Sequence, residues 1–161
     1  MQGEAPALPW SEADRSSDAM SRLDGLKVLV VEDDGLIGAL ICFELEAVGA
    51  EVVGPAASVS EALSLLAAVE VDGAVLDVNL GPELVYPVAD LLIERQVPLI
   101  FSTGFPVSEM PVRYWHLPRQ DKPYCASELA KRLAAMCDMA ARLSFAPFLG
   151  PDPKRERLAL A

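Results

Sequence analysis

Acidic, hydroxyl and ammonium side chains that could do chemistry stand at four widely separated places in the chain, three of them directly after short apolar runs. Glu32 and Asp33 come directly after the run VLVV, and Asp77 follows the run AVL. Thr103 follows LIFS, and Lys122 stands directly before a proline. If these runs are parallel strands, their carboxyl ends meet at one edge of a sheet. The sequence therefore predicts one site that combines carboxylates, a hydroxyl and an ammonium.

This combination of groups indicates phosphoryl transfer. Neighbouring carboxylates repel one another unless a cation joins them, and a site made of oxygen ligands favours Mg²⁺. Lys122 and the Thr103 hydroxyl can each contact one oxygen of a transferred phosphoryl group. No strong base accompanies these motifs, so we do not expect an activated serine or cysteine. The role that remains for the central carboxylate, Asp77, is that of phosphoryl acceptor, with positioning and charge neutralisation supplying the catalysis.

Strand-like and helix-like patterns alternate about five times in the middle of the chain. Strands are predicted at 27–31, 51–53, 74–76 and 97–101, with a fifth ending near Lys122. Apolar residues at helical spacing separate them; Gly49 ends the first helix, and Ser58 with Glu61 forms a capping box for the second. This alternation predicts an α/β fold with a doubly wound, five-stranded parallel sheet. Three prolines between 104 and 118 exclude a long helix there.

The motifs, taken in order, resemble those of the response-regulator receiver family. Glu32 and Asp33 stand where that family has its acidic metal-binding pair, and Asp77, in VLDVNLG, stands at its phosphorylated aspartate. Thr103, in FSTGF, matches its switch hydroxyl, and Lys122, in DKPY, matches a lysine that precedes a cis-proline. The resemblance covers roughly residues 25–141.

The resemblance implies a flavodoxin-like three-layer sandwich whose fourth helix is short or absent. It implies Mg²⁺ held by Glu32, Asp33, Asp77 and the backbone carbonyl of Asn79. It also implies a single-domain response regulator, not an enzyme beyond its own phosphotransfer and autodephosphorylation. Such a protein accepts a phosphoryl group from a sensor histidine kinase and signals through altered contacts with a downstream protein.

Several stretches are closest to the alphaproteobacterial "FAT GUY" single-domain receivers, namely VVGPAAS, AVLDVNL, VYPVADLL and IFSTGF. That resemblance implies a kinase of the HWE type or a relative of one, and a role in a stress or phosphorelay network. The sequence departs from the wider family at Arg119, where an aromatic residue is usual. It also departs in its polar fifth strand, which is tolerable at a sheet edge, and at Glu32, which is one methylene longer than Asp.

Composition and length limit the class of protein. The 161 residues are 52% hydrophobic and 23% charged, which suits one globular receiver domain at 23–143 between tails at 1–22 and 144–161. The net charge of -11 disfavours nucleic acid. Neither a membrane span nor a secretory signal is evident, and the three cysteines fit no metal or disulfide pattern. We expect a cytoplasmic protein that is a monomer or weak dimer.

Simpler interpretations stand beside these. Glu32, Asp33 or Asp34 could cap the first helix, and Asp34 could do only this. Tyr114 and Trp115 could form a partner surface or pack on the sheet in place of the short helix, and His116 has no evident role.

Other functions also remain open. A receiver-like binding module that does not depend on phosphate is the main alternative. An aspartyl phosphatase is disfavoured because Asn79 stands where a second acid is needed, and a cobalamin module because a histidine is absent there.

Overall fold

The computed structural model describes residues 23–144. The predicted tails lie outside the described residues, except that the last helix includes Ser144. The elements in chain order are β1 (Lys27–Val31), α2 (Gly35–Ala47), β2 (Glu51–Ala56), α3 (Val59–Ala68), β3 (Gly73–Asp77), β4 (Asn79–Leu80), β5 (Glu83–Leu84), α4 (Tyr86–Glu94), β6 (Leu99–Thr103), η1 (Val107–Glu109), η2 (Val112–Tyr114), β7 (Arg119–Asp121) and α5 (Ala126–Ser144). None of the helices within 23–144 is both long and apolar enough to cross a membrane.

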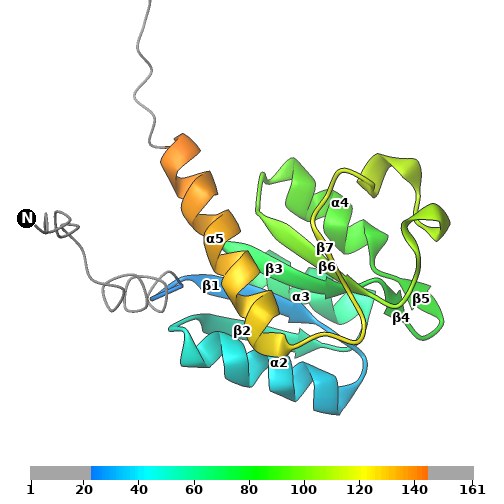
Figure 1. Ribbon diagram of the computed structural model, residues 1–161, viewed down its shortest axis with the longest axis horizontal. Helices are drawn as coiled ribbons and strands as arrows, with labels where there is room; N and C mark the ends of the chain where they lie inside the picture. The colour runs from blue at the N-terminus through cyan, green and yellow to red at the C-terminus, as the bar shows by residue number, and fades with distance from the viewer. Residues whose placement is uncertain (1–22, 145–161) are drawn as a thin grey trace, which may run out of the picture.

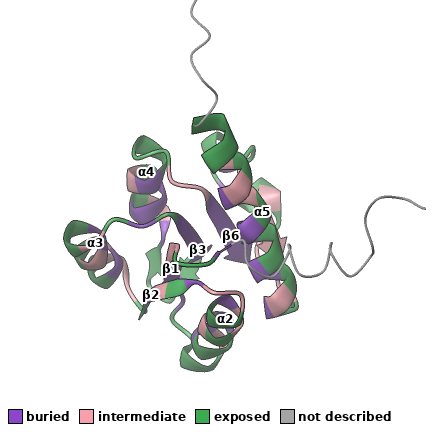
Figure 2. Ribbon diagram, turned by 90° about the vertical axis from the view of Figure 1, so that its left-hand side faces the viewer, coloured by how far each residue is buried: buried purple, intermediate pink, exposed green. Residues whose placement is uncertain are grey.

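Five strands form one parallel sheet in the order β2-β1-β3-β6-β7. Helices α2 and α5 cover one face of this sheet, and α3 and α4 cover the other (Figure 1, Figure 2). The order of the strands reverses between β1 and β3, which is the switch point of a flavodoxin-like sheet. The predicted doubly wound, three-layer fold is therefore confirmed.

Each face of the sheet has its own apolar core. In β6, Phe101 packs with residues of α3 and α4, whereas its neighbour Ile100 packs with residues of α2 and α5. Because β1, β3 and β6 are covered on both faces, their residues are buried at almost every position. This double coverage explains why the central strands read as continuous apolar runs.

The predicted helix boundaries agree with the caps. Asp34 is the N-cap of α2, where its Oδ1 accepts hydrogen bonds from the backbone N–H groups of Leu36 and Ile37, so its predicted capping role is confirmed. Ser58 caps α3 and accepts from the N–H of Glu61, although the Glu61 carboxylate reaches back to Ala57 rather than to Ser58.

The polar fifth strand, β7, lies at the edge of the sheet. Arg119 pairs with Asp121 along the strand, with Nε 3.2 Å from Oδ1. From α5, Arg132 donates a hydrogen bond to the backbone carbonyl of Arg119. Because β7 faces solvent on one side and Arg132 binds one of its carbonyl groups, the strand does not need an apolar sequence.

Two short 3-10 turns, η1 and η2, replace a full helix between β6 and β7. Tyr114 is buried there, stacks on Tyr86 with 4.6 Å between ring centroids, and contacts Phe101 edge-on. Its hydroxyl donates to Asp90 of α4 at 2.6 Å. Tyr114 therefore packs on the sheet in place of the missing helix, whereas Trp115 remains about half exposed.

Some predicted strand boundaries were wrong. Strand β6 spans 99–103 instead of 97–101, and β2 continues to Ala56. The stretch after Asp77 contains the short antiparallel hairpin β4–β5. The shift in β6 places Thr103 inside the strand rather than after it.

Candidate functional site

The predicted site residues lie at the carboxyl ends of the parallel strands. Glu32 follows β1 directly, Asp77 ends β3, and Thr103 ends β6. Lys122 follows β7, and its backbone N–H donates to the carbonyl of Thr103 at 2.8 Å. The Lys122–Pro123 peptide bond is cis. Residues from four strands thus meet at one edge of the sheet, near the switch point.

Lys122 joins two buried carboxylates. Its Nζ lies 2.8 Å from Oδ2 of Asp77 and 3.1 Å from Oε2 of Glu32. Glu32 is only 3% exposed and Asp77 only 5% exposed. The other Asp77 oxygen, Oδ1, accepts from the backbone N–H of Asn79 at 3.1 Å. The ammonium is therefore positioned beside the carboxylate expected to react.

The Glu32 carboxyl is held in an environment that disfavours its charge. Its pKa is raised from 4.5 to about 7, first by burial and then by the nearby Asp77 carboxylate, and the Lys122 ammonium offsets only part of this rise. For Lys122, burial lowers the pKa, but the hydrogen bonds and charges of Asp77 and Glu32 outweigh burial and leave the pKa raised. One ammonium therefore does not fully compensate the negative charge of these carboxylates.

The donor set fits a divalent cation. Carboxylate oxygens of Glu32, Asp33 and Asp77 lie within 4.8 Å of one another. Three carboxylates against one ammonium leave an excess of two negative charges when all are ionised, and the ligands are all oxygen, as Mg²⁺ prefers. A cavity of about 420 Å³ opens over these groups and is also lined by Asn79 and Gly81. The residues present could therefore hold Mg²⁺.

Thr103 lies beside this group, but its hydroxyl is engaged elsewhere. Its Oγ1 accepts a hydrogen bond from the backbone N–H of Phe105 at 2.9 Å. Strand pairing places the neighbouring Ser102 opposite Asp77, so Thr103 stands at the same edge. The structure thus brings Glu32, Asp33, Asp77 and Lys122 together, and leaves Thr103 holding the start of the 104–118 loop.

Two contacts around the site were not predicted. Glu83 of β5 accepts from the backbone N–H of Val59, which ties the hairpin after Asp77 to α3. Ser102 donates to the hydroxyl of Tyr124 at 2.8 Å. A signal for the second contact existed, because a serine in a fully buried strand requires a hydrogen-bond partner.

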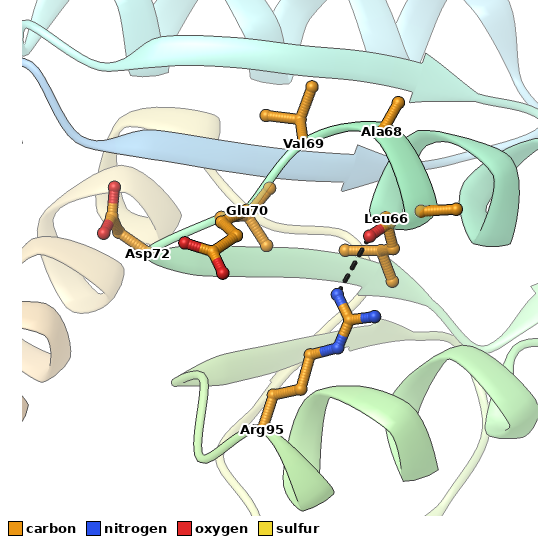
Figure 3. A pocket seen from close by; sticks show the side chains of 8 residues that line it. Leu66, Ala68, Val69, Glu70, Asp72 and Arg95 are labelled. Atoms are coloured by element: carbon orange, nitrogen blue, oxygen red, sulfur yellow. Dashed lines mark hydrogen bonds between the residues drawn. The ribbon is translucent and has the colours of Figure 1, made fainter.

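A larger cavity, of about 660 Å³, lies away from the carboxylates (Figure 3). The end of α3, the segment leading into β3, and Arg95 line it. The Arg95 guanidinium donates to the backbone carbonyl of Leu66 at 2.9 Å, which satisfies a free carbonyl at the end of a helix. This cavity adjoins the amino end of β3, opposite Asp77, and does not include the candidate residues.

Solved structures share this fold, whereas no family model and no curated protein matches the sequence. SdrG from Sphingomonas melonis Fr1 is 35% identical over 72% of this chain and 98% of that chain, with a TM-score of 0.61. The BeF3-activated conformation of SdrG matches with 36% identity over 70% of this chain and 98% of that chain, and a TM-score of 0.59.

Longer response regulators also match. PhyR from Brucella abortus is 25% identical over 83% of this chain, with a TM-score of 0.69. The match covers only 56% of that protein, so this chain spans little more than half of its length. These relatives are response-regulator receiver domains or contain one. With SdrG matched over nearly its whole length, the chain belongs to the response-regulator receiver family.

Proposed function

We propose that this protein accepts a phosphoryl group on Asp77 from a sensor histidine kinase and signals through altered protein contacts. The observation that carries the proposal is the contact of the Lys122 ammonium with Asp77, which is one of a group of three carboxylates. A bound phosphoryl group adds negative charge at this point, and Lys122 is placed to pair with it.

The transfer itself needs little from the protein beyond positioning. One carboxylate oxygen of Asp77 forms a bond to phosphorus while the P–N bond of the donor phosphohistidine breaks. The imidazole leaves with that electron pair and takes up a proton, and an acyl phosphate remains on Asp77. Glu32, Asp33, Asp77 and the Asn79 carbonyl would hold Mg²⁺, which would supply positive charge for the phosphoryl oxygens.

The signal would leave the site through Thr103. Its hydroxyl accepts from the backbone N–H of Phe105, and we propose that it gives up this bond when it turns toward a phosphoryl oxygen. That change releases the first residues of the 104–118 loop, whose far part rests on α4 through Tyr114. Arg119, which pairs with Asp121, stands where the family usually has an aromatic residue. The aromatic contact of Phe101 with Tyr114 supports a route through the loop instead.

The surface beside the site suits a protein as phosphodonor. Three apolar side chains of α2 lie along one face of the helix and are exposed, Leu36 at 83%, Leu40 at 53% and Phe43 at 66%. Ile37, one residue after Leu36, lines the cavity over Asp77. An apolar helix face at the rim of the site supports docking of a kinase, for which the resemblance favours the HWE type.

Phosphotransfer to the purified protein tests the proposal. Acetyl phosphate with Mg²⁺, or a phosphorylated HWE-type kinase, is expected to give a shifted band on a Phos-tag gel. Asp77→Asn should abolish the band, whereas Glu70→Gln, an exposed acid beside the larger cavity, should leave it intact. A wild-type protein that never shifts contradicts the proposal. Arg119 would then favour a binding module that does not depend on phosphate.

A further inference from the structure

A single side-chain hydrogen bond ties the segment after Lys122 to the middle of the sheet. Ser102 Oγ donates to Tyr124 Oη at 2.8 Å. Ser102 belongs to β6 and is fully buried, while Tyr124 is half-buried and packs against the core beneath α2 and α5. Ser102 is also the strand partner of Asp77. The bond thus connects the strand beside the phosphoryl acceptor to the residue two positions beyond Lys122.

The other backbone hydrogen bonds of this segment run to β6 and to α5, where the Cys125 carbonyl accepts from the N–H groups of Glu128 and Leu129. Strand β7 has only three residues and lies at the sheet edge, and residues 122–125 belong to no helix or strand. At Lys122 itself, the backbone N–H donates a hydrogen bond to the carbonyl of Thr103. Two residues further along the chain, the Tyr124 hydroxyl accepts a hydrogen bond from Ser102. Lys122 therefore stands between two attachments, both to β6.

We propose that Tyr124 and Ser102 are positioning residues that hold Lys122 against Asp77. This inference rests on the proposed function, because it concerns the same phosphoryl transfer. The long lysine side chain can reach Asp77 from many positions of its backbone, but only a fixed backbone holds the ammonium ready for the charge that develops on the phosphoryl oxygens. Small displacements of such a group cost a large part of the rate.

The Tyr124→Phe variant removes one hydroxyl and keeps the ring. The expected result is a fall of roughly tenfold in the maximal rate of phosphorylation by acetyl phosphate with Mg²⁺, with little change in the donor concentration that gives half the maximal rate. That split is expected because Lys122 acts on the transition state more than on donor binding. Tyr86→Phe, which removes a hydroxyl on the other face of the sheet, should keep the wild-type rate.

A second variant separates positioning from stability. Tyr124→Phe alone leaves the buried Ser102 hydroxyl without its partner, which destabilises the fold. The double variant Ser102→Ala with Tyr124→Phe removes both groups, so its stability should recover toward the wild type while the rate stays low. Recovery of the rate together with the stability would overturn the inference, because the bond would then be structural only.

The outcomes also separate this inference from the proposed function. If the wild type is phosphorylated on Asp77 and Tyr124→Phe matches it in maximal rate, only the positioning role fails. If the wild type takes up no phosphoryl group under conditions in which it is folded, the proposed function fails and the inference fails with it. A slow Tyr124→Phe and a slow double variant, beside an unchanged Tyr86→Phe, support the inference.

Discussion

The ammonium of Lys122 lies 2.8 Å from Oδ2 of Asp77, although their strands are not neighbours in the sheet. Strand β6 lies between β3 and β7, so Lys122 must reach across the end of β6 to make this contact. The same ammonium also contacts the buried carboxylate of Glu32. One cation therefore holds two carboxylates that come from strands on either side of the switch point.

Removal of that cation is expected to destabilise the fold. In Lys122→Met, two buried carboxylates face each other without an ammonium, and the free energy of unfolding should fall by about 1–3 kcal/mol. The lysine side chain is one-quarter exposed, which keeps the loss below that of a fully buried pair. Urea unfolding at pH 8 without Mg²⁺ measures it. Lys131→Met, at an exposed position of α5, is the control, and equal losses in the two variants contradict the prediction.

Mg²⁺ is expected to stabilise the protein through Asp33. At a concentration about ten times its Kd, Mg²⁺ should add about 1.4 kcal/mol and raise Tm by several degrees, and EDTA should reverse the change. Asp33→Asn should largely abolish this shift. Asp34→Asn is a matched control one residue away, because the Asp34 side chain caps α2 and asparagine caps equally well. An undiminished shift in Asp33→Asn would mean that Asp33 is not a ligand.

The stability of the protein should fall in alkaline solution because of Cys137. Burial, with a smaller contribution from the charge of Asp72, raises the pKa of this thiol from 9.0 to about 11. The folded protein therefore holds the proton more tightly than the unfolded chain. This contribution is complete below pH 9 and is lost as the pH rises through 11, with a slope approaching about 1.4 kcal/mol per pH unit.

Comparison of variants isolates that effect from other groups that titrate in the same range. Urea unfolding between pH 8 and 11 should show a steeper loss for the wild type than for Cys137→Ala. Cys125→Ala, which changes an exposed cysteine whose pKa is lowered by its hydrogen bond with Ser127, should keep the wild-type slope above pH 9. Parallel curves for all three proteins would contradict the raised pKa.

The fold and most of the site could be predicted because each depends on patterns that are local in sequence. The alternation of apolar runs with helical spacing predicts the layers, and strand ends predict which edge carries Glu32, Asp77 and Lys122. Strand boundaries failed where apolar residues continue into a loop. Val97 and Pro98 extend the apolar run before β6 begins. Ser102 and Thr103 are polar, so the apolar run ends before the strand does.

Contacts between side chains distant in sequence could not be predicted in the same way. Nothing local pairs Ser102 with Tyr124, or Tyr114 with Asp90, since each pair forms only once the sheet has brought its elements together. The hydrogen bond from the backbone N–H of Phe105 to the Thr103 hydroxyl also depends on how the chain turns after β6, and not on residue type. The proposed switching depends on the contacts of Thr103 and Tyr114, and the proposed positioning of Lys122 depends on the contact of Ser102 with Tyr124.

The loop that replaces the missing helix should depend on Tyr114. Tyr114→Phe loses the hydrogen bond to Asp90, whose carboxylate is about half exposed and can be hydrated, so the cost should be about 1 kcal/mol. Tyr114→Ala also removes the buried ring that stacks on Tyr86, and should cost about 3–5 kcal/mol. Urea unfolding checks both values. A Tyr114→Ala protein as stable as Tyr114→Phe would show that the ring does not hold the loop.

The hydrogen bond between Thr103 and Phe105 should report the switch directly. In the resting protein the backbone N–H of Phe105 is bound to Thr103 Oγ1 and should exchange slowly with solvent deuterium. Phosphorylation of Asp77 should draw the hydroxyl away and speed this exchange. Thr103→Val lacks the hydroxyl, so the Phe105 amide should exchange fast with or without phosphate, whereas Thr103→Ser should respond as the wild type does. If phosphorylated wild-type protein keeps a slowly exchanging Phe105 amide, Thr103 is not the residue that carries the signal into the loop.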